Sequence, residues 1–306
     1  MPQARRAAIV MALLSLVWGY AWITAKIGLD HAGPFDFAFL RVAVGVLTLG
    51  ALLLWQRRPL QPVPWRAAIF MGVVQTAAFL ELNTWALVDS GPGKTSILTF
   101  TMPFWVVLFA WPVLGERLRG LQWLAASLAL GGLVAILEPW RLEASTASKL
   151  LAVLAGATWA AGVVVAKRLH GRVQTDALQL TFWQMLIGLV PMALIAWLVP
   201  QRPVDWSLPL AGALAFSGVL ATGLGWFMWL YVLHRLPAGT TSLSSLAIPV
   251  VAAVSSALQL GERLRPAELG GMCAIAAALA LNARAAPQAV PGEATDASTT
   301  SPGSRR

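Results

Sequence analysis

The six-residue string Leu-Gly-Glu-Arg-Leu-Arg spans Leu114–Arg119 and occurs again, unchanged, at Leu260–Arg265, 146 residues further along the 306-residue chain. Each copy begins eleven residues after a proline, Pro103 or Pro249, inside a long apolar run. The same shift aligns residues 93–96 (Gly-Lys-Thr-Ser) with residues 239–242 (Gly-Thr-Thr-Ser), and a shift of 141 residues aligns Trp18 and Lys26 with Trp159 and Lys167. The sequence therefore predicts a duplicated membrane unit, a pattern typical of transporters.

The composition indicates a protein that lies in a membrane. Hydrophobic residues make up 58% of the chain and charged residues only 11%, with a mean hydropathy of +0.70. Soluble domains carry about 25% charged residues, and apolar runs of roughly 20 residues are long enough to cross a bilayer as helices. The runs lack the alternating pattern of a membrane barrel. The net charge of +9 lies in short loops, so we expect no nucleic-acid partner.

The hydropathy pattern predicts an all-α integral membrane protein with ten transmembrane helices. We divide the chain into a cytoplasmic N-terminus (1–6), a first five-helix repeat (7–138), a second five-helix repeat (149–285) and a disordered C-terminal tail (286–306), which is rich in Ala, Pro, Ser, Thr and Gly. The predicted spans are 7–28, 34–56, 65–88, 92–113, 119–138, 149–169, 176–199, 208–234, 238–260 and 266–285.

The distribution of Lys and Arg predicts the orientation. With ten spans, 14 of the 22 basic residues lie on the side of both termini and 8 on the other side, which places both termini in the cytoplasm. Five spans per unit is an odd number, so the second repeat enters the membrane from the opposite side. Two inverted repeats favour a central cavity at their interface and alternating access. Each chain holds both repeats, so a monomer suffices.

The doubled blocks, with their prolines and the small residues at 93–96 and 239–242, resemble the drug/metabolite transporter superfamily, specifically its EamA-type ten-helix members. The resemblance covers residues 7–285. It implies an exporter of amino acids or other metabolites without an ATPase domain, with helices 1, 3, 4, 6, 8 and 9 around the cavity and helices 5 and 10 at the periphery. The chain is most similar to bacterial exporters of aromatic and other neutral amino acids, which implies a multi-pass protein of the inner membrane.

These observations favour a secondary transporter that exports small amphipathic metabolites, above all neutral or aromatic amino acids. Its expected partners are a small-molecule substrate, the lipid bilayer and, as a candidate coupling ion, protons. One alternative is efflux of drugs or organic cations. An intramembrane enzyme is a different class, but His31, His170 and His234 lie at span ends, and no cluster has metal-ligand spacing. We therefore expect no catalytic residues, metal or cofactor.

Aromatic and polar side chains inside the spans are the candidate substrate-binding residues. Aromatic walls with a few polar groups suit an amphipathic solute, although lipid-facing packing is an alternative for any single tryptophan. Gln75 and Phe79 share a helix face, with Asn83 one turn further, and Gln184 takes the place of Arg41 in the second repeat. The candidates are Trp18, Trp22, Gln75, Phe79, Asn83, Thr99, Trp159, Gln184, Ser244 and Ser245.

Three ionisable residues are candidates for coupling: Glu81, the acidic residue deep within a predicted span, Arg41 at a similar depth, and Lys26 nearer the surface. A charge buried in a membrane is costly and by default indicates function. In one interpretation Arg41 and Glu81 form a structural ion pair. In another, Glu81 carries a proton or holds an amine, which leaves Arg41 for a carboxylate. Glu81 lies two residues before Asn83 and points to roughly the opposite side of the helix.

The repeated block also holds candidate gate and hinge residues. Glu116 and Glu262 sit next to arginines at span ends, where they form either gates or local turns with exposed ion pairs of little energy. Pro103 and Pro249 are expected in the middle of a span, where proline kinks a helix. The two kinks act either as hinges or as static bends.

Overall fold

The apolar runs form helices throughout the part of the chain that this computed structural model describes: residues 2–60, 63–116, 120–137, 146–170, 176–260 and 266–285. The first half contains α1 (Pro2–His31), α2 (Pro34–Trp55), α3 (Trp65–Phe70), the π-helix η1 (Met71–Ala78), α4 (Phe79–Val88), α5 (Pro92–Thr99), α6 (Met102–Leu114) and α7 (Leu121–Leu137). The second half contains α8 (Thr146–His170), α9 (Ala177–Leu198), α10 (Leu208–Leu214), the π-helix η2 (Ala215–Leu224), α11 (Gly225–Leu233), α12 (Ala238–Ser244), α13 (Ala247–Leu260) and α14 (Pro266–Ala285).

Eight stretches of helix are long and apolar enough to cross a membrane, which confirms the all-α membrane class. They are Arg5–His31, Pro34–Trp55, Trp65–Val88, Thr95–Leu114, Ala147–His170, Ala177–Leu198, Leu208–Leu233 and Thr240–Gln259. Within α7 only the shorter stretch Leu121–Gly132 is as apolar, so the count of ten crossings stays a prediction. The helix α1 begins at Pro2, before the expected start at residue 7, because proline is well suited to a first turn and no other breaker follows it.

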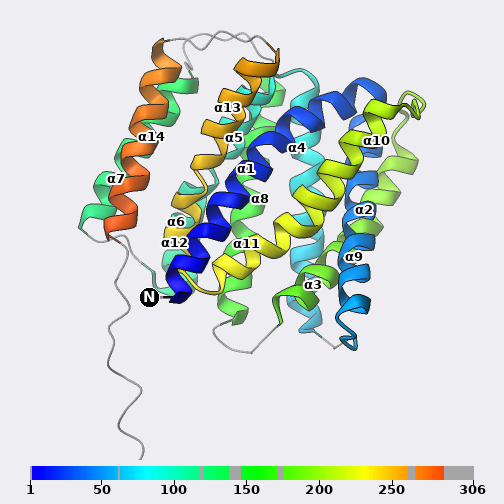
Figure 1. The fold of residues 1–306 in the computed structure, drawn as a ribbon, viewed down its shortest axis with the longest axis horizontal. Coiled ribbons are helices and arrows are strands. Elements are labelled where there is room, and N and C mark those ends of the chain that lie inside the picture. The colour runs from blue at the N-terminus through cyan, green and yellow to red at the C-terminus, as the bar shows by residue number, and fades with distance from the viewer. Residues whose placement is uncertain are drawn as a thin grey trace, which may run out of the picture.

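Contacts between loops show that the two repeats run in opposite directions. Helix α1 ends at His31, whose ring contacts Asp205 between α9 and α10. Helix α2 then runs to the other end of the bundle, about 33 Å away for 22 residues, where Arg58 pairs with Asp176 at the start of α9. Helix α8 ends there, at His170. We call these two ends the His31 face and the His170 face; Figure 1 shows α1 and α8 crossing between them.

The third and fourth spans carry matching irregularities in both repeats. The third contains a π-helix in the same place, η1 or η2. The fourth is broken into two helices, α5 and α6 or α12 and α13. Pro103 and Pro249 lie in the first turn after each break, where a missing N–H removes no helical bond. The expected kink inside a continuous helix is therefore wrong, and each fourth span is a discontinuous helix instead.

Packing joins the two repeats closely. Helix α2 packs on η2, and α9 packs on η1, so the second span of each repeat contacts the third span of the other. Helices α7 and α14 pair with each other at one edge of the bundle (Figure 1), as the family resemblance implied for helices 5 and 10.

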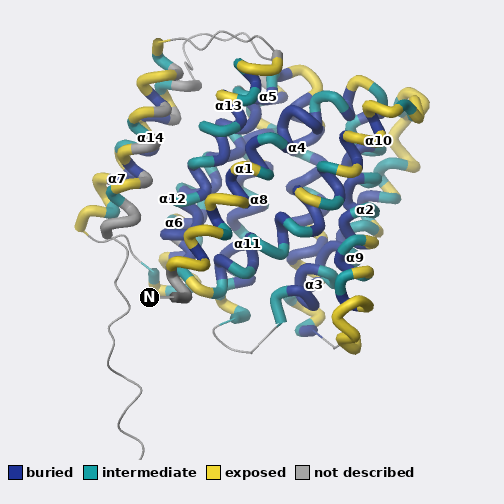
Figure 2. Tube along the Cα trace, viewed as in Figure 1, coloured by how far each residue is buried: buried dark blue, intermediate teal, exposed yellow. Residues whose placement is uncertain are grey.

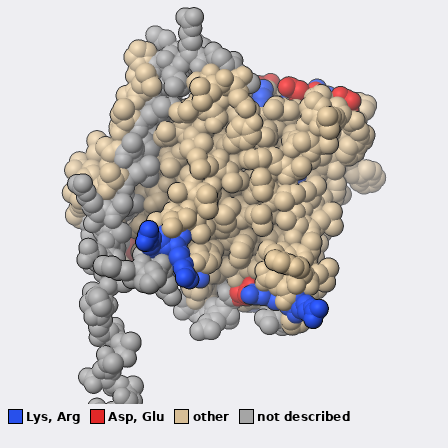
Figure 3. All heavy atoms as spheres, in the orientation of Figure 1, with Lys and Arg blue, Asp and Glu red and all other residues tan. Residues whose placement is uncertain are grey.

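The surface fits a lipid environment. Buried residues fill the middle of the bundle (Figure 2), and large apolar side chains such as Trp197 (80% exposed) and Leu258 (82% exposed) point outward. In the view of Figure 3, charged side chains gather at the two ends of the bundle, and the broad band between them is mostly uncharged. Such a band is expected of a surface that contacts acyl chains.

Candidate functional site

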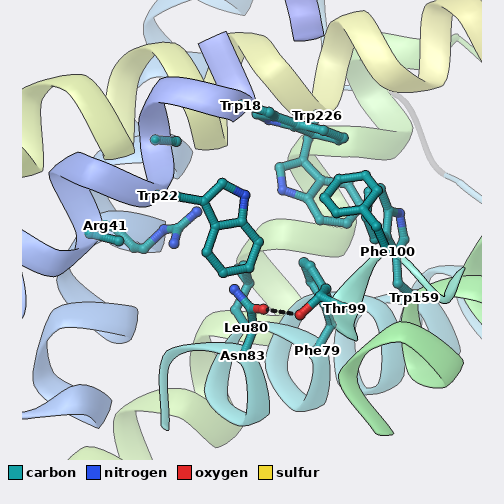
Figure 4. Close-up of a pocket in the computed structure, with 12 residues that line it drawn as sticks. Trp18, Trp22, Arg41, Phe79, Leu80, Asn83, Thr99, Phe100, Trp159 and Trp226 are labelled. Carbon is teal, nitrogen blue, oxygen red and sulfur yellow. Dashed lines mark hydrogen bonds between the residues drawn. The ribbon is translucent and has the colours of Figure 1, made fainter. Parts of the chain in front are cut away.

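A cavity lies between the two repeats (Figure 4). Its volume is about 50 Å³, room for a few water molecules at roughly 10–15 Å³ each. It is lined by Trp18, Ala21, Trp22, Ala25, Arg41, Phe79, Leu80, Asn83, Thr99, Phe100, Trp159 and Trp226. Drug-sized ligands occupy pockets of about 300 Å³ or more, so a metabolite fits only when these side chains move apart.

An aromatic cluster forms one wall of the cavity. Trp18 and Trp159, which the repeat aligns with each other, touch edge to face with ring centroids 5.4 Å apart. Trp226 and Trp229 lie 5.6 and 5.7 Å from Trp18. Phe79 packs 5.1 Å from Trp159. Edge-on and tilted ring contacts of this kind are favourable, so the cluster is a continuous aromatic surface along one side of the cavity.

Trp18 is fixed by a hydrogen bond to the other repeat. Its Nε1–H donates to the carbonyl oxygen of Ala221 in η2, at 2.7 Å. The close approach needs Gly225, because a Cβ there would lie 2.4 Å from that indole nitrogen. The Nε1–H of Trp159 is buried and has no acceptor among the described residues. The two related indoles are therefore held differently.

Polar groups gather at the other end of the cavity. Arg41 is 8% exposed, and its Nε donates to Thr222 Oγ1 in η2 at 3.2 Å. Thr99 Oγ1 donates to Asn83 Oδ1 at 2.8 Å, the dashed line in Figure 4. The guanidinium group of Arg41 points from α2 towards Trp22. The cavity thus has an aromatic wall and a polar, positively charged end.

The backbone follows the symmetry of the two repeats, but the charge of Arg41 has no counterpart in the second repeat. A Cβ at Gly45 would lie 2.8 Å from Thr222 Cγ2, and a Cβ at Gly188 would lie 2.7 Å from Thr76 Cβ. Arg41 and Gln184 each lie four residues before these glycines. Their surroundings match, but only one of the two carries a charge.

Some predicted site residues lie outside the cavity. Gln75 packs against Gly162 of α8 and lies within η1, whose i→i+5 bonds invalidate the α-helical spacing that placed it beside Phe79. Gln184 is buried, and its backbone carbonyl lies against Gly72. Ser244 and Ser245 donate to carbonyl oxygens of their own helix, Thr240 and Ser242 respectively, at 2.8 and 2.7 Å. None of these four side chains lines the cavity.

Glu81 is also outside the cavity and does not pair with Arg41. The carboxylate is 5% exposed, and its two oxygens have no hydrogen-bond partner among the described residues. The acidic group close enough to act on it is Asp36, near the start of α2. In the described part of the chain the side-chain ion pairs are His31–Asp205 and Arg58–Asp176. The predicted alternative of an Arg41–Glu81 pair is wrong, because Glu81 projects from the side of α4 opposite to Asn83.

The two aligned lysines close opposite ends of the molecule. Lys26 Nζ donates to the carbonyl oxygens of Leu87 and Val88 at the end of α4, at 3.3 and 3.2 Å. Lys167 Nζ donates to those of Leu233 and Leu236 at the end of α11, at 2.9 and 2.6 Å. Each lysine therefore binds the first span of a repeat to the third. We call these contacts the lysine clamps.

The acidic residue of the first copy of the doubled string, Glu116, lies near one of these clamps. Glu116 lies close enough to Lys167 to act on its charge, so the string of the first repeat meets the clamp of the second. Glu262, its counterpart, lies outside the described residues. Glu116 is next to Arg117 in the sequence, and the fold brings it near Lys167.

A second cavity opens at the His170 face. Its lining includes Arg58, Asp176, His234 and Arg235. The rings of His170 and His234 stack there with centroids 3.9 Å apart. Burial, with the nearby charges of His170, Lys167 and Arg235, lowers the pKa of His234 to about 3. Among the described residues no group of three or more His, Cys, Asp or Glu side chains is placed to hold a metal.

Five residues of the cavity lining were not predicted from the sequence: Ala21, Ala25, Leu80, Phe100 and Trp226. The 146-residue shift offers a signal for two of them, since it aligns Trp226 with Leu80.

Apolar helices in two inverted repeats, with a cavity between them, define a multi-pass membrane transporter. The model of the EamA-like transporter family matches residues 5–138 and again residues 147–284. The chain therefore belongs to the EamA-like transporter family.

Relatives support the same class. An uncharacterized transporter of Bacillus subtilis is 26% identical over 257 residues, 82% of this chain and 87% of the relative. An uncharacterized protein of Pseudomonas aeruginosa is 33% identical over 277 residues, 88% and 93% of the two chains. A protein of Salmonella typhimurium named "Probable amino-acid metabolite efflux pump" is 25% identical over 291 residues, 91% and 95% of the two chains. A crystal structure shares the fold with a TM-score of 0.77 at 19% identity, over 92% of this chain and 98% of that one.

Proposed function

We propose that this protein is a secondary transporter that exports neutral and aromatic amino acids by alternating access. The observation that carries the proposal is the aromatic cavity at the interface of the two inverted repeats, with Trp18 and Trp159 in contact across that interface. Aromatic rings suit the apolar part of such a solute, and the polar end suits its charged part. The printed name of the Salmonella typhimurium relative points to the same substrates.

The proposed orientation places the His170 face in the cytoplasm of a bacterial inner membrane. Arg5, Arg6, Arg57, Arg58 and Arg66 all belong to helix ends or loops on that side. The His31 face carries Asp30, Asp89 and Asp205 at its rim. An excess of basic residues in short loops marks the cytoplasmic side, and both termini then lie there.

Alternating access in this proposal is an exchange between the lysine clamps. Opening to the cytoplasm requires Lys167 to release the carbonyl oxygens at the end of α11, and opening to the outside requires Lys26 to release those at the end of α4. The breaks before Pro103 and Pro249 let the two halves of each fourth span move separately during this exchange. The small volume of the cavity corresponds to the step in which both clamps are closed.

Glu81 is the proposed proton carrier. Glu81 is buried within the third span, and its carboxylate oxygens have no hydrogen-bond donor among the described residues. Asp36 is the nearby acidic group. A carboxyl group in such a place is by default functional. Because it faces away from the cavity, it couples transport to protons through the position of α4 and not through contact with the substrate.

Uptake of a panel of labelled amino acids into proteoliposomes, with and without a proton gradient, tests the proposal. We expect saturable movement of neutral and aromatic amino acids that the gradient accelerates. Glu81→Gln should transport at a rate that does not change between about pH 5.5 and 8, while the exposed acid Asp89, changed to Asn, serves as the control. If no amino acid moves with folded protein, the substrate is wrong; if Glu81→Gln keeps the wild-type pH dependence, the coupling role is wrong.

A further inference from the structure

The side chains that face the cavity offer hydrogen-bond donors and no acid. Arg41 is the charged group in the lining, and no Asp or Glu is found there among the described residues. Nε of Arg41 is used by Thr222, while its two terminal nitrogens have no acceptor in the described part of the chain. A guanidinium group held by one neighbour keeps a planar fork free for a carboxylate.

Asn83 adds a donor at the same end. Its Oδ1 already accepts from Thr99 Oγ1, which turns the amide nitrogen towards Trp22 and the open side of the cavity (Figure 4). A ligand that accepts hydrogen bonds satisfies these groups, whereas an ammonium group satisfies none of them.

Glu81, the candidate for binding a substrate amine, lies outside the cavity. Glu81 faces Asp36 and does not line the cavity. Gln184, which takes the place of Arg41 in the second repeat, is uncharged and lies outside the lining. The cavity therefore provides one cationic anchor and no anionic one.

We propose that the cavity selects apolar and aromatic monocarboxylates through Arg41, and that an α-amino group on the substrate contributes little to recognition. This inference rests on the proposed transport function and extends it to acids without an amino group, such as 3-phenylpropanoate. A single arginine anchor favours one carboxylate over two. Organic cations are disfavoured, because they bring a second positive charge next to Arg41 at low dielectric.

Three probes that differ by one group test the proposal. Phenylalanine carries both charges, 3-phenylpropanoate lacks only the amino group, and 2-phenylethylamine lacks only the carboxylate. Binding to the purified full-length protein is measured by isothermal titration calorimetry at pH 7.5, which avoids passive diffusion of the acid through vesicles. We expect the first two probes to bind within about threefold of each other and the amine at least about tenfold more weakly, as loss of a charge-assisted pair predicts.

Variants assign the effect to Arg41. Arg41→Gln should weaken phenylalanine and 3-phenylpropanoate by about tenfold or more and remove the discrimination against the amine. Arg41→Lys should recover part of the affinity, since it keeps the charge without the fork. Arg66→Gln is the matched control, because it removes an arginine from an exposed position outside the cavity. If Arg41→Gln does not fold, the affinities of the three probes for the wild type still test whether the cavity recognises the carboxylate and not the amine.

The outcomes separate this inference from the proposed function. If phenylalanine binds but 3-phenylpropanoate is more than tenfold weaker, the inference fails and amino-acid transport stands. If the amine binds as well as phenylalanine, the inference also fails. If 3-phenylpropanoate binds and phenylalanine does not, amino-acid export fails and the carboxylate site stands. If no probe binds to folded protein, both are overturned.

Discussion

Changing Trp18 to Phe and Trp159 to Phe makes the same chemical change at two positions that the repeat relates to each other. Both indoles are buried in the same aromatic cluster and touch each other. The indole N–H of Trp18 donates to the carbonyl oxygen of Ala221, whereas that of Trp159 has no acceptor among the described residues. The loss of ring volume is common to both variants, so their difference isolates the N–H groups.

The expected sign and size follow from the cost of unpaired polar groups. Trp18→Phe loses a hydrogen bond, whereas Trp159→Phe removes a buried N–H donor that has no acceptor among the described residues. Together these effects should make Trp18→Phe less stable than Trp159→Phe by roughly 1–3 kcal/mol. At about 2–4 °C per kcal/mol, the scale of soluble proteins of 150–250 residues, this is a difference in melting temperature of roughly 2–12 °C.

The assay is thermal unfolding of the two purified variants and the wild type in the same detergent, without ligand. Substrate binding to each variant, measured in parallel, should fall for both because each trims the aromatic wall. Equal melting temperatures for the two variants, or a lower one for Trp159→Phe, would refute the assignment of the hydrogen bond between Trp18 and η2 and the symmetry argument with it.

Three further predictions concern packing, charge and the clamps. Gly225→Ala places a methyl group 2.4 Å from an indole nitrogen and should cost about 1–3 kcal/mol in thermal unfolding, whereas Gly212→Ala, which meets open space, should be neutral or stabilising. Burial lowers the pKa of His234 from 6.5 to about 3, so between these pH values the unfolded chain binds a proton at His234 that the folded chain does not. The wild type should therefore lose stability as the pH falls from 6.5 towards 3, and His234→Gln should lose less. Lys167→Met should increase hydrogen exchange at the end of α11 and leave the end of α4 protected, and Lys26→Met should do the reverse; exchange that rises at both ends in either variant contradicts two independent clamps.

Arg41 and Gln184 show how a duplicated chain acquires direction. The glycines beside them make the same close contacts with Thr222 and Thr76, so the repeats share a backbone frame. A charge in one copy and an amide in the other gives the cavity a polar end, and under the proposal above a substrate with one carboxylate would bind in one orientation. Asymmetry at the site is thus a local change on a symmetric scaffold.

The sequence by itself determined the class of this protein. Long apolar runs and scarce charges predict membrane helices because the bilayer imposes length and hydrophobicity on every span. The doubled Leu-Gly-Glu-Arg-Leu-Arg string indicates the duplication, and an odd number of predicted spans in each unit predicts that the two units are inverted. These properties are local or additive along the chain, so no contact between distant residues is needed to infer them.

The set of polar residues that share the cavity follows from the three-dimensional packing of the helices. Asn83 faces it and Glu81 does not, although they are two residues apart, and Gln75 is lost from it because η1 changes the rotation of the third span. The partners of Arg41 and Trp18 both lie in η2, about 180 and 200 residues away. Such contacts depend on the rotation of whole helices about their axes and on their packing across the interface of the repeats. In spans that are apolar on all sides, hydropathy carries little information about that rotation.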